Sequence, residues 1–117
     1  MTIRMQDMTE WVQALKRSEK TIIVEGKKDK QALESLGIGR EGKIVMLSKR
    51  PIYAIIEQVA DNATDAIILT DLDKKGKELY GKLSSGLQRL GVRVDNKYRE
   101  FLQKQRVSHI EGISSIN

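Results

Sequence analysis

The sequence contains no cysteine, which excludes structural disulfides, thiol nucleophiles and cysteine-ligated zinc within its 117 residues. Aromatic residues are scarce, with one Trp, three Tyr and one Phe. None is interleaved with the basic clusters, so the sequence predicts no stacking platform for single-stranded nucleic acid. Unbroken apolar runs span only a few residues, whereas a membrane-spanning helix needs about 20. The N-terminus also lacks an apolar signal core, and we therefore expect a cytoplasmic protein.

The overall composition is that of a folded, well-charged domain. Single domains commonly contain about 100 to 150 residues, so the chain has the length of one domain. Apolar residues make up 39% of it and charged residues 32%, a balance that argues against disorder. The formal net charge of +5 favours anionic partners.

Strand and helix signals alternate along the chain. Three segments are rich in β-branched and apolar residues and predict strands buried in a parallel sheet: 20–25, 43–47 and 66–71. Four segments carry apolar residues at helical spacing and predict helices: 5–17, 28–36, 51–59 and 79–90. The last includes a stripe that we expect in the core: Leu79, Leu83, Leu87 and Leu90.

Weaker signals follow near the C-terminus. We expect a short strand at 92–94, a helix capped by Asp95, an edge strand at 107–110 and a frayed tail beyond Gly112. The alternation predicts an α/β fold with a mainly parallel central sheet flanked by helices, because parallel strands need crossover connections. We divide the chain into a packing helix (1–18), the main domain (19–112) and a tail (113–117).

Acidic residues stand at the ends of two predicted strands. Glu25 ends the first, and Asp71 and Asp73 end the strongest. In an extended backbone residues two apart point to the same side, so these two carboxylates can converge on one cation. Open α/β sheets bind ligands outside the carboxyl ends of their strands. We therefore predict a Mg²⁺ site here, with Mn²⁺ as the alternative ion.

Basic residues and glycines accompany these acids. Eight of the 21 basic residues follow predicted strand ends: Lys27, Lys28, Lys30, Lys49, Arg50, Lys74, Lys75 and Lys77. Of these we single out Lys27, Lys28, Lys74 and Lys75 as phosphate or nucleic-acid contacts. Acids ringed by lysines suit a place where a metal meets phosphate. Gly26 and Gly76 are predicted to let phosphate approach the backbone N–H groups that open the next helices.

These motifs resemble the Toprim domain of topoisomerases, DnaG-type primases, OLD-family nucleases and the ribonuclease that matures 5S ribosomal RNA. Glu25-Gly26 with Asp29, followed by Asp71-Leu72-Asp73 and Gly76, carries the resemblance, which covers roughly residues 19–112. It implies a Rossmann-like fold, with Glu25 as general acid or base. It also implies Asp71 and Asp73 as Mg²⁺ ligands, with Glu25 as a further candidate ligand and Asp29 as a weaker one.

We expect a Mg²⁺-dependent phosphodiester enzyme, most simply a nuclease similar to the 5S RNA ribonuclease, with RNA or DNA as partner. One alternative is a non-catalytic module that binds nucleic acid or nucleotides with a partner. Another is a small phosphatase or phosphotransferase, because Asp71-Leu72-Asp73 also resembles the haloacid dehalogenase motif. That motif, however, normally follows the first strand and has a small Thr or Val where Lys75 stands.

Two further residues and the assembly state complete the expectations. His109, the sole histidine, is predicted to be structural, and Glu111-Gly112 repeats the Glu25-Gly26 pattern after the expected edge strand. About 100 ordered residues offer a limited binding surface. A homodimer or a protein partner is therefore a further expectation.

Overall fold

The described part of the chain forms one parallel sheet with strands in the order β2-β1-β3-β4. The computed structural model describes residues 7–39 and 42–115. The strands are β1 (Thr21–Val24), β2 (Ile44–Met46), β3 (Asp65–Ile68) and β4 (Arg93–Val94). The helices are α1 (Met8–Arg17), α2 (Lys27–Ser35), α3 (Ile52–Asn62), α4 (Lys74–Arg89), α5 (Lys97–Lys104) and the 3₁₀ helix η2 (Ile110–Ser115).

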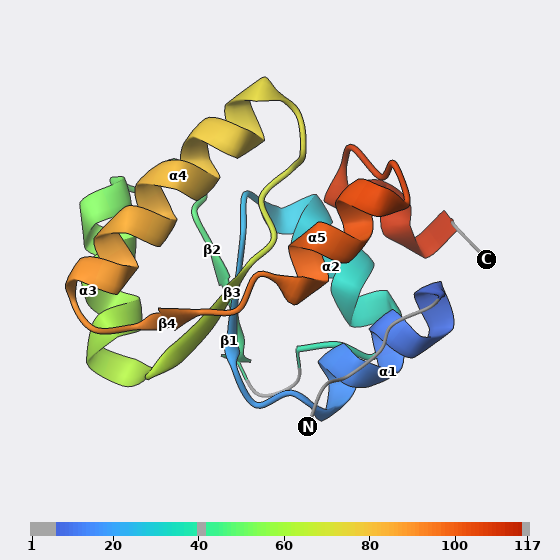
Figure 1. Ribbon diagram of the computed structural model, residues 1–117, viewed down its shortest axis with the longest axis horizontal. Coiled ribbons are helices and arrows are strands. Elements are labelled where there is room, and N and C mark those ends of the chain that lie inside the picture. The colour runs from blue at the N-terminus through green and yellow to red at the C-terminus, as the bar shows by residue number, and fades with distance from the viewer. Residues whose placement is uncertain (1–6, 40–41, 116–117) are drawn as a thin grey trace.

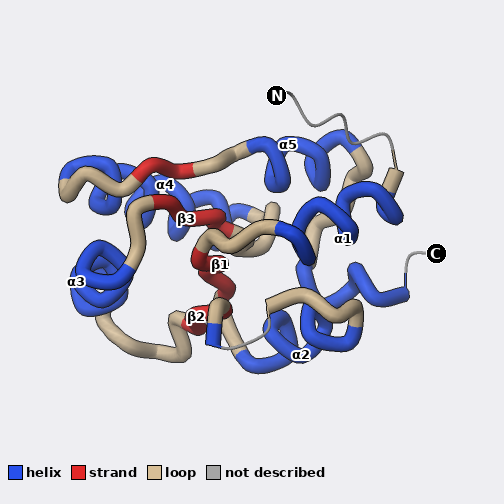
Figure 2. Tube along the Cα trace, turned by 90° about the horizontal axis from the view of Figure 1, so that it is seen from below, coloured by secondary structure: helices blue, strands red, loops and turns tan. Residues whose placement is uncertain are grey.

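Helices cover both faces of the sheet, as Figure 2 shows. Neighbouring side chains of a strand point to opposite faces, so Ile22 and Val24 join one core and Ile23 joins the other. The first core contains side chains of α1, α2, α5 and η2, and the second contains side chains of α3 and α4. The prediction of an α/β fold with a parallel sheet flanked by helices is confirmed.

The first helix shares a core with the sheet. Trp11 is fully buried, and its Nε1 donates a hydrogen bond to the Tyr98 carbonyl at 3.0 Å. The two rings meet edge to face, with 6.5 Å between their centroids. The packing role expected for this helix is confirmed, although Met5, where we expected it to begin, lies outside the described residues.

The structure corrects the expectations for the C-terminal segment. No strand forms at 107–110, and the chain beyond Gly112 continues the 3₁₀ helix η2 to Ser115. Val107, Ile110 and Ile113 are all buried against the first core. Their spacing of three residues fits the three-residue turn of a 3₁₀ helix, whereas a strand would bury alternate residues. Glu111 therefore follows no strand.

Two other expectations are wrong in detail. Leu90 is 54% exposed because α4 ends at Arg89 and Leu90 is its C-cap. Leu83 and Leu87 are fully buried, as expected. The N-cap of α5 is Asn96 and not Asp95, although Asp95 Oδ1 accepts a hydrogen bond from the backbone N–H of Lys97 at 3.2 Å.

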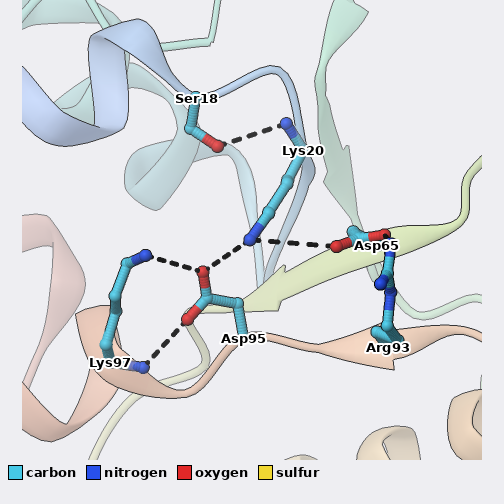
Figure 3. A network of polar contacts seen from close by, with 6 residues as sticks. All are labelled: Ser18, Lys20, Asp65, Arg93, Asp95 and Lys97. Carbon is cyan, nitrogen blue, oxygen red and sulfur yellow. Dashed lines mark hydrogen bonds and ion pairs between the residues drawn. The ribbon is translucent and has the colours of Figure 1, made fainter. Parts of the chain in front are cut away.

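A network of charged side chains joins the strands near the amino end of the sheet (Figure 3). Lys20 Nζ lies 2.8 Å from Asp95 Oδ2 and 3.8 Å from Asp65 Oδ2. Arg93 and Lys97 add ion pairs to Asp65 and Asp95 at 3.0 Å and 3.4 Å. Burial raises the pKa of Asp95, but the hydrogen bonds and positive charges of Lys20 and Lys97 together outweigh it and hold that pKa below its usual value. The network ties β1, β3 and β4 together.

The helices of the described residues do not include one that is both long and apolar enough to cross a lipid bilayer.

Candidate metal site at the carboxyl edge of the sheet

The strand order brings the two acidic motifs together. Strands β1 and β3 are neighbours, with Ile23 opposite Ile68. Glu25 lies two residues after Ile23, and its side chain extends toward the segment that follows β3. Its Oε2 accepts a hydrogen bond from the backbone N–H of Asp71 at 2.7 Å. From β1 the chain continues to β2 on one side of β1, and it then crosses to β3 on the other side. The point between β1 and β3 is therefore the topological switch point, where open parallel sheets bind ligands. The loops after β1 and β3 leave the sheet at its upper end in Figure 1.

Residues 71–73, which we call the acid loop, form the second part of the connection from β3 to α4. Strand β3 ends at Ile68, so these residues are not the extended strand end that the sequence predicted. Asp73 is instead the N-cap of α4, and its Oδ1 accepts the Gly76 N–H at 2.8 Å. Asp71 Oδ1 accepts the backbone N–H of Ile110 at 2.8 Å. One oxygen of each carboxylate is thus held by the protein.

The segment that follows α5 docks on the acid loop and brings His109 to it. The Leu72 N–H donates to the Ser108 carbonyl at 2.8 Å, next to the bond between Ile110 and Asp71. His109 Nε2 then lies 3.5 Å from Asp73 Oδ2, while its Nδ1 lies 2.9 Å from Ser108 Oγ. We expected a structural role for His109, and the structure places it beside the acids.

Asp71, Asp73 and His109 could together hold a metal ion. Each offers one ligand atom, and these atoms lie within 4.8 Å of one another. Carboxylate oxygen and imidazole nitrogen are common ligands of divalent cations. Each of the three residues also has a second polar atom in contact with a protein neighbour, the arrangement that orients metal ligands.

Glu25 and Asp29 lie outside this group of three. The Asp29 side chain is buried, and its Oδ2 accepts the Gly26 N–H at 3.0 Å. It also accepts a backbone hydrogen bond from Glu111, which joins the start of α2 to η2. This gives Asp29 a structural role, while Glu25 remains at the edge of the candidate site.

Burial and neighbouring charges make ionisation of two acids costly. Burial raises the pKa of Glu25, and the charges of Asp71, Asp73 and Asp29 raise it further. The hydrogen bond from the Asp71 N–H lowers this pKa but does not cancel the rise. Burial likewise raises the pKa of Asp29, with contributions from Asp71 and Glu111. The mutual repulsion shows that several carboxylates lie close together at this edge of the sheet. A bound cation would reduce that repulsion.

A buried arginine that no motif of the sequence indicates supports the acid loop. Arg99 is only 4% exposed, and it donates hydrogen bonds to the Thr70 carbonyl, to Thr70 Oγ1 at 3.1 Å and to the Asp71 carbonyl at 2.9 Å. Its guanidinium lies over the Tyr80 ring, 4.8 Å from the centroid. Burial lowers the pKa of Arg99, and the charges of Glu25 and Asp71 oppose that shift. Arg99 thus holds the backbone that carries Asp71.

The backbone N–H groups of the two glycines make hydrogen bonds within the site. The N–H of Gly26 donates to Asp29, and that of Gly76 donates to Asp73, so these N–H groups already have partners within the protein. Gly76 is needed for another reason: an added Cβ would lie 1.8 Å from the Asp71 carbonyl oxygen. The missing side chain lets α4 begin directly against the acid loop.

The four singled-out lysines are exposed at the starts of two helices. Lys27 and Lys28 open α2, and Lys74 and Lys75 open α4. A helix dipole disfavours cations at this end by about 0.3 to 1 kcal/mol. A bound anion at the same end would offset that cost.

Comparison with known proteins finds relatives and a matching structure. No family model matches the chain. The UPF0292 protein MJ1624 of Methanocaldococcus jannaschii is 35% identical over 103 residues, which cover 87% of this chain and 79% of that protein. A UPF0292 protein of Thermococcus gammatolerans is 37% identical, over 92% of this chain and 78% of that protein. A solved structure of an Aquifex aeolicus protein has a TM-score of 0.84 and 32% identity, covering 92% of this chain and 98% of its own.

Proposed function

This chain belongs to the UPF0292 family, whose name states no activity, and we propose from its site that it is a nuclease dependent on a divalent metal ion. The convergence of Asp71, Asp73 and His109 at the carboxyl edge of the sheet carries the proposal. The resemblance of the acidic motifs to the Toprim domain supports it independently. We take Mg²⁺ or Mn²⁺ as the ion.

The residues suit hydrolysis of a phosphodiester. Water attacks phosphorus, the bond from phosphorus to one ester oxygen breaks, one proton leaves the water and one joins the departing oxygen. Glu25, hydrogen-bonded to the Asp71 backbone, would accept or donate such a proton at its carboxylate. A cation held by Asp71, Asp73 and His109 would stabilise the negative charge that develops on the phosphate.

A polymer of phosphates is favoured over a single small anion. The lysines at the starts of α2 and α4 flank the acid loop along the sheet edge, where a strand could contact several of them. Contacts between lysine and phosphate do not depend on base sequence. The site is therefore suited to binding the nucleic-acid backbone.

Substitution of the two aspartates tests the proposal. Structured RNA, single-stranded DNA and duplex DNA, each end-labelled, are incubated with EDTA, Mg²⁺ or Mn²⁺. We expect metal-dependent cleavage that the double variant Asp71→Asn/Asp73→Asn lowers by about 100-fold or more, because neutral amides hold a cation poorly. Asp61→Asn is a control for the same type of substitution at an exposed position on α3, and it should cleave normally.

Other outcomes identify the alternatives. Metal-dependent binding without cleavage, lost in the double aspartate variant, would indicate a binding module. Cleavage of a phosphomonoester but of no polymer would indicate a phosphatase. Cleavage of RNA or DNA that persists in EDTA would contradict the proposed metal site.

His109 should affect the preference for Mn²⁺ over Mg²⁺ more than the affinity for Mg²⁺. Imidazole binds Mn²⁺ better than Mg²⁺, which prefers oxygen. We expect His109→Ala to weaken Mn²⁺ binding about tenfold and Mg²⁺ binding much less. Calorimetric titration with each metal measures both affinities, and the electron spin echo spectrum of bound Mn²⁺ should lose its nitrogen modulation. Equal losses for the two metals would exclude His109 as a ligand.

A further inference from the structure

An open cavity at the protein surface, with a volume of about 330 Å³, adjoins the acid loop on the side of α5. It is lined by Leu72, Lys77, Gln103, Arg106, Val107 and Ser108. Leu72 lies between the two aspartates of the acid loop, and Ser108 precedes His109. The cavity therefore shares a wall with the candidate metal site, and a ligand bound in it would lie next to that site.

The lining combines two cations with an apolar wall. Lys77 and Arg106 are both exposed and contribute positive charge, and the lining includes no acid. Leu72 is half-buried and Val107 is buried, so they present carbon surface. Gln103 and Ser108 add groups that can donate or accept hydrogen bonds. In a nucleotide the phosphate matches the two cations, and the sugar and base match the apolar wall. One nucleotide unit also suits a cavity of this size.

The backbone at Arg106 indicates that its side chain matters. Helix α5 ends with the two hydrogen bonds of a Schellman motif, from Val107 N–H to the Leu102 carbonyl at 3.1 Å and from Arg106 N–H to the Gln103 carbonyl at 3.1 Å. Arg106 occupies the left-handed position of this motif, with φ of +58°. Glycine is the usual residue there because a Cβ is disfavoured. A strained arginine facing a cavity beside a candidate active site points to a ligand contact.

We propose that this cavity binds the nucleotide unit next to the phosphate that is cleaved, with Lys77 and Arg106 contacting its phosphate group. Leu72 and Val107 contact its sugar or base. The inference rests on the proposed function, because it assumes that a strand passes the acid loop. It adds a specific subsite to the general contacts made by the lysines at the starts of α2 and α4.

Binding without metal tests the subsite separately from catalysis. A ten-nucleotide single strand is titrated in EDTA at several salt concentrations. Each phosphate contact contributes about 0.7 to the slope of log K against log salt for single strands. We expect Lys77→Gln/Arg106→Gln to reduce that slope by about 1.4. The control pair Arg89→Gln/Lys104→Gln removes the same charge from exposed residues outside the cavity and should change the slope by less than half as much.

A second variant separates binding from folding. Arg106→Gly relieves the left-handed backbone, so it should match or exceed the wild type in thermal stability while binding the strand several-fold more weakly. Equal effects of the cavity and control pairs, or normal binding by Arg106→Gly, would overturn the inference. Adenosine monophosphate is the second probe, and tight binding of it with no binding of the strand would make the cavity a free-nucleotide site and also overturn it.

The inference and the proposed function can fail independently. Strand binding that depends on Lys77 and Arg106 without any cleavage would support the subsite and contradict the nuclease. Metal-dependent cleavage with no loss in the cavity variants would support the nuclease and contradict the subsite.

Discussion

Gly76→Ala is expected to destabilise the protein by about 3 kcal/mol or more and to weaken metal binding. The added Cβ would lie 1.8 Å from the Asp71 carbonyl oxygen and 2.4 Å from its carbonyl carbon. These are backbone atoms, so no side-chain rotation relieves the contact. Either the start of α4 or the acid loop must move, and both position the candidate ligands. Urea denaturation and metal titration measure the two effects.

Gly81→Ala provides a matched control within the same helix. A Cβ at Gly81 meets nothing within 4 Å, and the residue is in the interior of α4. Alanine is favoured over glycine at such positions by about 0.5 to 1 kcal/mol, so this variant should be slightly more stable than the wild type with metal binding unchanged. If Gly76→Ala behaved like Gly81→Ala, α4 could not approach the acid loop as closely as described.

Glu25→Gln should lower the proposed nuclease activity by about 10² to 10⁴ while making the metal-free protein more stable at neutral pH. Glutamine retains an oxygen that can accept the Asp71 N–H but loses the charge. The folded protein raises the pKa of Glu25 above its ordinary 4.5, mainly through burial and then through Asp71, Asp73 and Asp29. Ionised Glu25 therefore opposes folding, and its removal should increase the melting temperature.

The pH dependence checks the cause of that stabilisation. Because the folded-state pKa of Glu25 is raised, its favourable contribution is complete below about 4.5 and is lost as the pH rises through the folded-state value. The advantage of Glu25→Gln should accordingly be present at pH 7 and disappear below about pH 4.5. Glu34→Gln is the control, because Glu34 is exposed on α2. A similar gain in both variants would show that general surface charge, and not the site, is responsible.

The core of the fold was predictable because the spacing of apolar residues along the sequence indicates which side chains are buried. The β-branched runs around Ile23 and Ile67 predicted the parallel strands, and helical spacing predicted Leu83 and Leu87 in the core. The C-terminal segment was not predictable in this way. Val107, Ile110 and Ile113 are apolar in a short stretch, and only their packing against α2 and the sheet decides that a 3₁₀ helix, not a strand, forms from Ile110 onward.

Strand-end chemistry likewise placed Glu25, Asp71 and Asp73 at one edge, since the carboxyl ends of parallel strands meet there. The order of the strands along the sequence does not determine which strands are neighbours in a parallel sheet. The observed order β2-β1-β3-β4 places β1 beside β3, and this brings Glu25 to the Asp71 backbone. His109 and Arg99 reach the acid loop from 28 or more residues along the chain. No local pattern encodes such contacts, because they depend on how the segments after β4 fold back over the sheet.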